Sequence, residues 1–133
     1  MSSAGTLPDM IDLSTVALGD GALVRRTATG WLLSSIRPQW WYVANWPLDR
    51  KLAAGESVQV EADVRAGEVG FSFLREYESQ PWSEHVAGPG NVTALLCVSA
   101  GDPVPQRILL RSCASDDRPA VVEVRSIRLP SAG

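Results

Sequence analysis

The chain has 133 residues, the size of one domain, of which 45% are hydrophobic and 20% charged. A net charge of −3 argues against a protein that binds nucleic acid by neutralising many phosphates. No apolar run approaches about 18 residues, so no membrane-spanning helix is expected, and the N-terminus lacks the pattern of a secretory signal. We therefore expect a cytoplasmic protein, and the strong preference for Arg over Lys suggests a bacterial one.

The first half of the chain predicts an arm followed by three short strands. Residues 1–20 are rich in small and polar side chains, and we expect an arm or a loosely attached first strand there. Strand-like patterns follow at residues 22–27 and 31–36. Residues 40–46 are aromatic and lie between two prolines, which favours another short strand.

The clearest strand covers residues 57–65, where apolar and polar side chains alternate without a break. Its predicted core positions are Val58, Val60, Ala62 and Val64. A tight turn at Ala66-Gly67 predicts a hairpin partner at residues 69–74. Three residues of that partner share one face: Val69, Phe71 and Phe73. Gly70 interrupts this strand, so a bulge or a close approach of another group is expected there.

The last third of the chain predicts a loop and three more strands. Residues 75–90 are mostly polar and are predicted to form a long loop. Strands are predicted at residues 91–99, 108–112 and 121–129. The apolar positions of the last strand change phase, so we expect a bulge near Arg125-Ser126.

About eight short strands without any helical periodicity predict an all-β fold, an antiparallel β-sandwich. We expect a single sandwich domain over residues 21–130, with an N-terminal arm or first strand at 1–20 and a C-terminal stub at 131–133. The two cysteines, Cys97 and Cys113, are too few for a disulfide scaffold and are interpreted as small buried thiols, the alternative being a single disulfide between them.

A family resemblance rests on four segments, namely Trp41-Tyr42-Val43, SVQVEADVRAGEVGFSFL at 57–74, ILLRS at 108–112 and VVEVRSIRL at 121–129. Over residues 40–129 the chain resembles the jelly-roll sandwiches of carbohydrate-binding modules. It is particularly similar to the accessory domains found beside bacterial methyltransferases and glycosyltransferases. The resemblance implies a non-catalytic module that positions a glycan or a glycosylated small molecule for an enzyme. It assigns no binding residue by position.

Aromatic side chains are the first candidates for a binding surface, because sugars stack their flat C–H faces on exposed rings. In a regularly alternating strand Trp40, Tyr42 and Trp46 would share one face. Trp41 and Val43 would share the other. We predict that Trp40, Tyr42 and Trp46 are stacking platforms for a sugar. The alternative is that all the aromatic rings pack in the core.

A second set of candidate residues follows residue 74. It combines aromatic rings, carboxylates, a guanidinium and the only histidine, which suits the binding of hydroxyl or carboxylate groups. The predicted ligand-binding residues are Arg75, Glu76, Tyr77, Glu78, Trp82, Glu84 and His85. The alternative is a solvated surface loop with no ligand.

Arg111 interrupts an apolar strand, and an inward orientation would require an acidic partner or a ligand. We favour an outward orientation. The chain has no metal-binding His or Cys motif and no phosphate-binding glycine loop, so neither a metal nor any other cofactor is expected. A structural calcium ion is the one alternative, with oxygen donors from Asp102, Asp116, Asp117 and Glu123.

Two further functions stay open. Exposed aromatic side chains favour an interface in a homodimer or with a partner enzyme, which a mass that changes with concentration would reveal. The third hypothesis is a small enzyme that uses His85 and a nearby glutamate for proton transfer. Replacing His85 with Ala would then abolish the activity.

Overall fold

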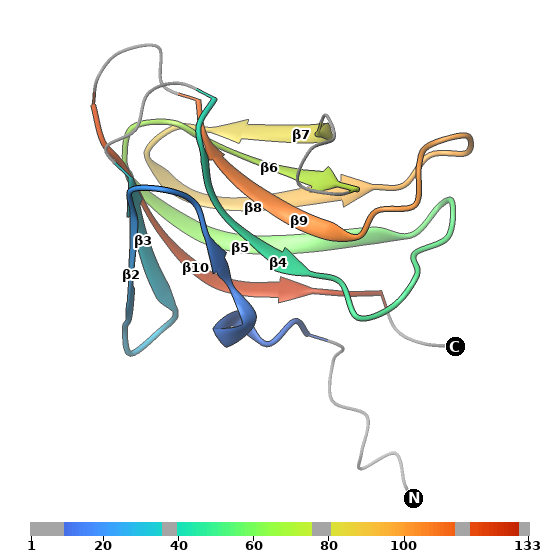
Figure 1. Ribbon diagram of the computed structural model, residues 1–133, viewed down its shortest axis with the longest axis horizontal. Coiled ribbons are helices and arrows are strands. Elements are labelled where there is room, and N and C mark those ends of the chain that lie inside the picture. Colours follow the sequence, from blue (N-terminus) through green and yellow to red (C-terminus); the bar gives the residue numbers. More distant parts are fainter. Residues whose placement is uncertain (1–9, 36–39, 76–80, 114–117, 131–133) are drawn as a thin grey trace, which may run out of the picture.

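The computed structural model describes residues 10–35, 40–75, 81–113 and 118–130. Within these residues ten strands form two five-stranded antiparallel sheets that pack as a sandwich (Figure 1). Sheet 1 has the order β1-β4-β9-β6-β7, with β1 at Ala17–Leu18, β4 at Tyr42–Pro47, β9 at Arg107–Ser112, β6 at Val69–Leu74 and β7 at Trp82–Ala87. Sheet 2 has the order β2-β3-β10-β5-β8, with β2 at Ala22–Arg26, β3 at Trp31–Ser35, β10 at Ala120–Arg128, β5 at Ser57–Ala66 and β8 at Gly90–Cys97.

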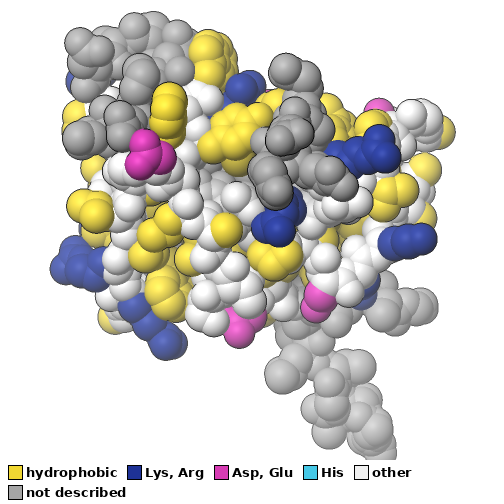
Figure 2. All heavy atoms as spheres, in the orientation of Figure 1, with side chains coloured by type: hydrophobic (Ala, Val, Ile, Leu, Met, Phe, Trp, Pro, Cys, Tyr) yellow, Lys and Arg dark blue, Asp and Glu magenta, His cyan; other side chains and the backbone are white. Residues whose placement is uncertain are grey.

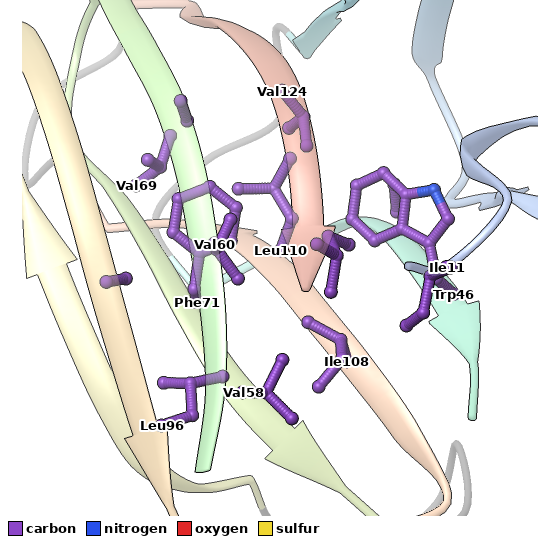
Figure 3. Close-up of a cluster of buried hydrophobic side chains, with 14 of the residues drawn as sticks. Ile11, Trp46, Val58, Val60, Val69, Phe71, Leu96, Ile108, Leu110 and Val124 are labelled. Carbon is purple, nitrogen blue, oxygen red and sulfur yellow. The ribbon is translucent and has the colours of Figure 1, made fainter. Parts of the chain in front are cut away.

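The prediction of an antiparallel β-sandwich is therefore confirmed. The core lies between the two sheets, and β5 supplies the four apolar side chains expected from its alternation, each at most 2% exposed. The core-facing side chains of β6 are likewise buried. Figure 3 shows Val58 and Val60 from β5 in one cluster with Phe71, Ile108 and Leu110 of sheet 1.

Two predicted backbone features are also confirmed. Gly67 has a φ of 74° in the β5–β6 turn, a conformation that glycine adopts without strain. The register of β10 against β5 shifts between Val124 and Ser126, which is the predicted bulge. The shift brings both Val124 and Ile127 into the core, because one additional residue changes the phase of the alternation.

The prediction of a loop throughout residues 75–90 is wrong, because β7 occupies part of that segment and pairs with β6. β7 is an edge strand, and none of its residues is fully buried. Its pairing also shifts near Ser83, whose φ is 57°. A partly exposed and irregular edge strand lacks the alternation of apolar and polar residues that would have predicted it.

The N-terminal segment is more closely attached than an arm over the residues that the structure describes. A short 3-10 helix, η2, spans Leu13–Thr15, and β1 pairs with β4. The backbone N–H of Ile11 donates to the carbonyl of Ile127 at 2.9 Å, and the Ile11 side chain is 8% exposed. The described part of this segment is thus attached to both sheets, through β1 to sheet 1 and through Ile11 to β10 of sheet 2.

The two cysteines are free thiols in different surroundings. Cys113 is buried, as expected, whereas Cys97 is exposed at the end of the edge strand β8. The expectation of two buried thiols is thus wrong for Cys97, because alternation on an edge strand places every second side chain outside. No helix among the described residues is long and apolar enough to span a membrane.

Candidate functional site

An ion pair lies near the middle of the outer side of sheet 1. Arg111 of β9 and Glu84 of β7 form a bidentate ion pair, with Nε to Oε2 at 2.5 Å and Nη2 to Oε1 at 2.6 Å. Their side chains are 18% and 17% exposed. The hydrogen bonds to Glu84 raise the pKa of Arg111 above its ordinary value. The prediction that Arg111 points outward is confirmed, and its acidic partner lies on the same outer side.

Gly70 makes this ion pair possible. It lies on β6, the strand between β7 and β9, and is the direct partner of Arg111. A Cβ atom at this position would lie 2.8 Å from Cδ of Glu84 and 2.9 Å from Sγ of Cys113. Only a glycine therefore leaves room for the Glu84 carboxylate to cross β6, which confirms the predicted close approach.

Trp40 lies next to the ion pair and is still largely accessible. The guanidinium carbon of Arg111 is 4.5 Å from the centroid of the Trp40 ring, within the range of a cation–π interaction. Trp40 is 49% exposed and has a φ of 70°, a conformation that costs energy for a residue with a Cβ atom. Such strain is found preferentially at binding and catalytic sites.

Two further aromatic residues follow Trp40 directly in the chain. Tyr42 is half-buried and is the β4 partner of Arg111. Trp41 is 39% exposed, and its Nε1–H donates to the carbonyl of Asp20 at 3.1 Å. We define Trp40, Trp41, Tyr42, Glu84 and Arg111 as the aromatic site. Figure 2 shows hydrophobic side chains among charged ones on the surface of the molecule.

Trp46 is not part of this surface, and its prediction as a stacking platform is wrong. Its side chain is fully buried in the core cluster (Figure 3), and its Nε1–H donates to the carbonyl of Leu13 at 3.1 Å. The cause is a register shift in β4 between Tyr42 and Ala44. The extra residue, Val43, changes the phase, so Trp46 faces the core and the alternation assumed from Trp40 to Trp46 fails.

The second predicted set is only partly brought to the site. Glu84 belongs to it, whereas Trp82 packs on Phe73 with ring centroids 6.0 Å apart and is only half-exposed. Arg75 is exposed at the end of β6. The predictions for Glu76, Tyr77 and Glu78 fall outside the described residues and stay untested.

His85 and Glu84 point to opposite sides of β7 and do not form a proton-transfer pair, whereas the hypothesis with another nearby glutamate stays a prediction, because Glu76 lies outside the described residues. His85 is the register partner of Phe71, whose ring lies in the core, while Glu84 contacts Gly70 and Arg111 on the outer side. Both oxygens of Glu84 are engaged by Arg111. The arrangement offers hydrogen-bonding groups beside aromatic rings, which suits binding.

Among the described residues, no three His, Cys, Asp or Glu side chains lie close enough together to hold a metal ion. The Glu123 carboxylate accepts hydrogen bonds from Thr27, Thr29 and Arg125. The Oδ2 atom of Asp102 accepts from the backbone of Ser99. Asp116 and Asp117 lie outside the described residues, so the calcium alternative is untested.

Two residues of the aromatic site, Trp41 and Arg111, were not among the predicted binding residues, and neither was Gly70, which leaves room for the ion pair. Regular alternation puts Trp41 on the face opposite Trp40, and the positive φ of Trp40, which interrupts that alternation, leaves no mark in the sequence. Arg111 was singled out as an unusual residue within an apolar strand. Gly70 was singled out by its position within a strand, and these two signals together point to the site.

Comparison with known proteins identifies the fold. No family model and no curated protein matches the sequence. Among solved structures, a family 29 carbohydrate-binding module in complex with mannohexaose has a TM-score of 0.64 and 12% identity, covering 92% of this chain and 91% of that chain. Another family 29 module, in complex with cellulohexaose, has a TM-score of 0.61 and 14% identity over 84% of this chain and 77% of that chain. The chain therefore has the jelly-roll fold of carbohydrate-binding modules, as the resemblance implied.

Proposed function

We propose that this domain is a non-catalytic module that binds a glycan at the aromatic site. The observation that carries the proposal is the position of Trp40, which remains 49% exposed beside the Arg111–Glu84 ion pair despite a strained backbone. An exposed ring next to hydrogen-bond donors and acceptors suits a sugar, which has apolar faces and polar edges. The fold of the family 29 modules supports the same function.

The resemblance to accessory domains supports a role in positioning the glycan, or a glycosylated small molecule, for an enzyme. In this role Trp40 and Trp41 provide the stacking surface, and Tyr42 provides a hydroxyl at its edge. Glu84 and Arg111 contact the sugar hydroxyl groups without leaving their ion pair, because each carboxylate oxygen can accept more than one hydrogen bond.

The test is a titration of the full chain with a panel of neutral oligosaccharides that includes mannohexaose and cellulohexaose. Intrinsic Trp fluorescence and calorimetry are the two readouts, and an equal concentration of glycerol is the blank. We expect a saturable change with at least one sugar. Trp40→Ala should weaken that binding about tenfold, the size of one lost stacking contact.

Leu23→Ala is the matched control, since Leu23 is 71% exposed on sheet 2 and its replacement removes apolar surface elsewhere. It should leave the affinity unchanged. The proposal is wrong if no sugar of the panel binds, or if Trp40→Ala binds as tightly as the parent protein.

Exposed Leu23 also supports the second candidate function, an assembly domain. β2 is an edge strand of sheet 2, and Leu23 borders an apolar hollow with Leu32. Edge strands with exposed apolar residues can pair with another chain. A dimer of this kind would give a mass that doubles with concentration, and Leu23→Asp would return it to the monomer mass.

A further inference from the structure

A second feature of sheet 1 lies at the opposite end of β9 from the aromatic site. Residues 47–51, which end and follow β4, and residues 104–107, which precede and begin β9, line a cleft of about 440 Å³. The two loops are joined by a hydrogen bond from the backbone N–H of Leu48 to the carbonyl of Gln106 at 2.8 Å. The backbone N–H of Gln106 in turn donates to Leu74 at 3.0 Å. The walls of the cleft are thus tied to the sheet.

The cleft is rich in positive charge. Arg50, Lys51 and Arg107 line it, and Asp49 is the only carboxylate among the described residues that do so. This excess of cations stands out in a chain whose net charge is −3. Figure 2 shows dark blue basic side chains towards the end of the molecule where the β4–β5 and β8–β9 loops project in Figure 1.

The Arg107 side chain is fixed by a hydrogen bond to β4. Its Nη1 donates to Oδ1 of Asn45 at 2.6 Å, a neutral partner that leaves the positive charge uncompensated by this contact. Arg107 and Arg111 are four positions apart in β9, so they share a face of the strand at a distance of about 13 Å. The cleft and the aromatic site therefore lie along one strand.

The two ends of β9 differ in charge balance. Arg111 is neutralised by the bidentate contact with Glu84, so the aromatic site suits uncharged sugar hydroxyl groups. The cleft, with three cations to one carboxylate, suits an oxyanion. A ligand that fits both carries a negative group a few sugar units away from the ring that stacks on Trp40.

We propose that the cleft binds an anionic substituent of the glycan, a carboxylate or sulfate oxyanion, so that the module selects acidic over neutral polysaccharides. This inference rests on the proposed glycan binding for its choice of ligand. Arg107 and Lys51 contact the oxyanion, and Arg107 supplies the planar donor geometry that fits a carboxylate.

The experiment compares three hexasaccharides by calorimetry on the full chain at low ionic strength: mannohexaose, a hexamer of mannuronic acid, and a sulfated mannohexaose. We expect an acidic hexamer to bind about tenfold or more tightly than the neutral one, as charge-assisted hydrogen bonds would provide. The difference in affinity between the acidic and the neutral hexamer should fall as the salt concentration is raised. Binding of the uronate alone, of the sulfate alone or of both supports the proposal and identifies the oxyanion.

Lys51→Gln and Arg107→Gln should each reduce the preference for the acidic hexamer. Lys51 is exposed, so its replacement tests the cleft without disturbing the contact between Arg107 and Asn45. Arg25→Gln, on the exposed edge of sheet 2, is the control for net charge and should retain the preference.

The failures of the two proposals are distinguishable. Equal affinity for neutral and acidic hexamers, with sensitivity to Trp40→Ala, would overturn the anionic cleft and leave glycan binding at the aromatic site. An acidic preference that both cleft variants retain would also overturn it. Acidic binding that is lost in Lys51→Gln but is insensitive to Trp40→Ala would support the cleft and overturn the aromatic site.

Discussion

Gly70 determines whether Glu84 can reach Arg111. These residues lie on three adjacent strands, and the carboxylate passes over the middle strand where a side chain would otherwise stand. A single missing Cβ atom thereby positions an ion pair at the centre of an exposed sheet. The conformational freedom of glycine is not the reason for its presence here.

Gly70→Ala should destabilise the protein and weaken glycan binding together. The new Cβ atom displaces the Glu84 carboxylate, and losing a charged hydrogen-bonded contact costs about 2 kcal/mol of unfolding free energy. Urea denaturation measures this loss. Gly88→Ala is the control, because a Cβ atom at Gly88 meets nothing within 4 Å. Equal stability of the two variants would contradict the steric role of Gly70.

The two cysteines should differ in reactivity, because Cys113 is buried and Cys97 is exposed. Burial raises the pKa of the Cys113 thiol to about 12, with the nearby Glu84 carboxylate adding to the effect. The thiolate is the reactive form, so Cys113 should be inert to iodoacetamide at pH 8 in the folded protein. Exposed Cys97 should be alkylated, as mass spectrometry of the native and the urea-unfolded protein would show. Cys97→Ser should then abolish labelling of the native protein, and residual fast labelling would contradict the burial argument.

At the scale of elements, β4 combines surface and core functions within six residues. Its bulge leaves Tyr42 on the outer side and turns Trp46 into the core. Trp40, just before the strand, extends the pairing with β9 by donating to Ser112 at 2.6 Å. One short segment therefore anchors the sandwich and presents the aromatic site.

Trp46→Ala and Trp40→Ala should separate these two roles. Removing the fully buried Trp46 should cost about 3–5 kcal/mol of unfolding free energy, because it creates a large cavity. Removing the half-exposed Trp40 should cost about 0.5 kcal/mol or less. Thermal denaturation followed by circular dichroism measures both. Similar losses for the two variants would contradict the change of phase at the bulge.

β3 pairs with β10 along its length, and the turn of the β2–β3 hairpin is held to β10 in addition by the Glu123 carboxylate. Glu123 is 1% exposed and accepts from the hydroxyls of Thr27 at 2.6 Å and Thr29 at 3.0 Å, with Arg125 on its other oxygen. Gly30 allows this contact, since a Cβ atom there would lie 3.0 Å from Cα of Arg125. The ionised form of Glu123 therefore stabilises the hairpin.

This contact predicts a loss of stability in acid. The hydrogen bond from Thr27, followed by that from Arg125, lowers the pKa of Glu123 from 4.5 to about 2 in the folded protein. The lowered pKa means that the stabilisation is complete above pH 4.5 and is lost as the pH falls towards 2. Urea midpoints measured across this range should fall less steeply for Glu123→Gln than for the parent protein. Glu61→Gln, on the neighbouring strand β5, is the control and should keep the parent slope.

At the scale of the whole molecule, neighbouring strands come from distant parts of the chain. β10 lies between β3 and β5, and β9 lies between β4 and β6. Each sheet is therefore completed only when the C-terminal strands enter it. The core and the aromatic site both depend on this closure, because Arg111 of β9 is surrounded by residues of β4, β6 and β7.

Refolding should be correspondingly slow for a domain of this size. Sandwiches dominated by pairing between distant strands fold in about milliseconds to seconds, because the loops must close before the contacts form. Stopped-flow fluorescence would follow this, since buried Trp46 reports on the formation of the core. A microsecond phase that recovers the full amplitude would contradict the dependence on closure.

The sequence by itself determined the class of fold and the face that each regular strand turns to the core. Alternation along β5 and β6, the turn at Gly67 and the phase change in β10 were all predicted, because period and turn chemistry are local properties. The close approach at Gly70 and the outward orientation of Arg111 were also anticipated. Local patterns failed where the pairing is irregular, as at Trp46 and throughout β7.

Only the tertiary structure decided which of these residues meet. The bulge in β4 depends on pairing with β9, and it determines that Trp46 is buried although Tyr42 lies on the outer side. Glu84 reaches Arg111 because only one strand, β6, lies between their strands and carries Gly70 at the crossing point. The cleft likewise forms between two loops that are more than 50 residues apart in the chain. Contacts between distant segments depend on strand order and register, and neither is encoded in the periodicity of one strand.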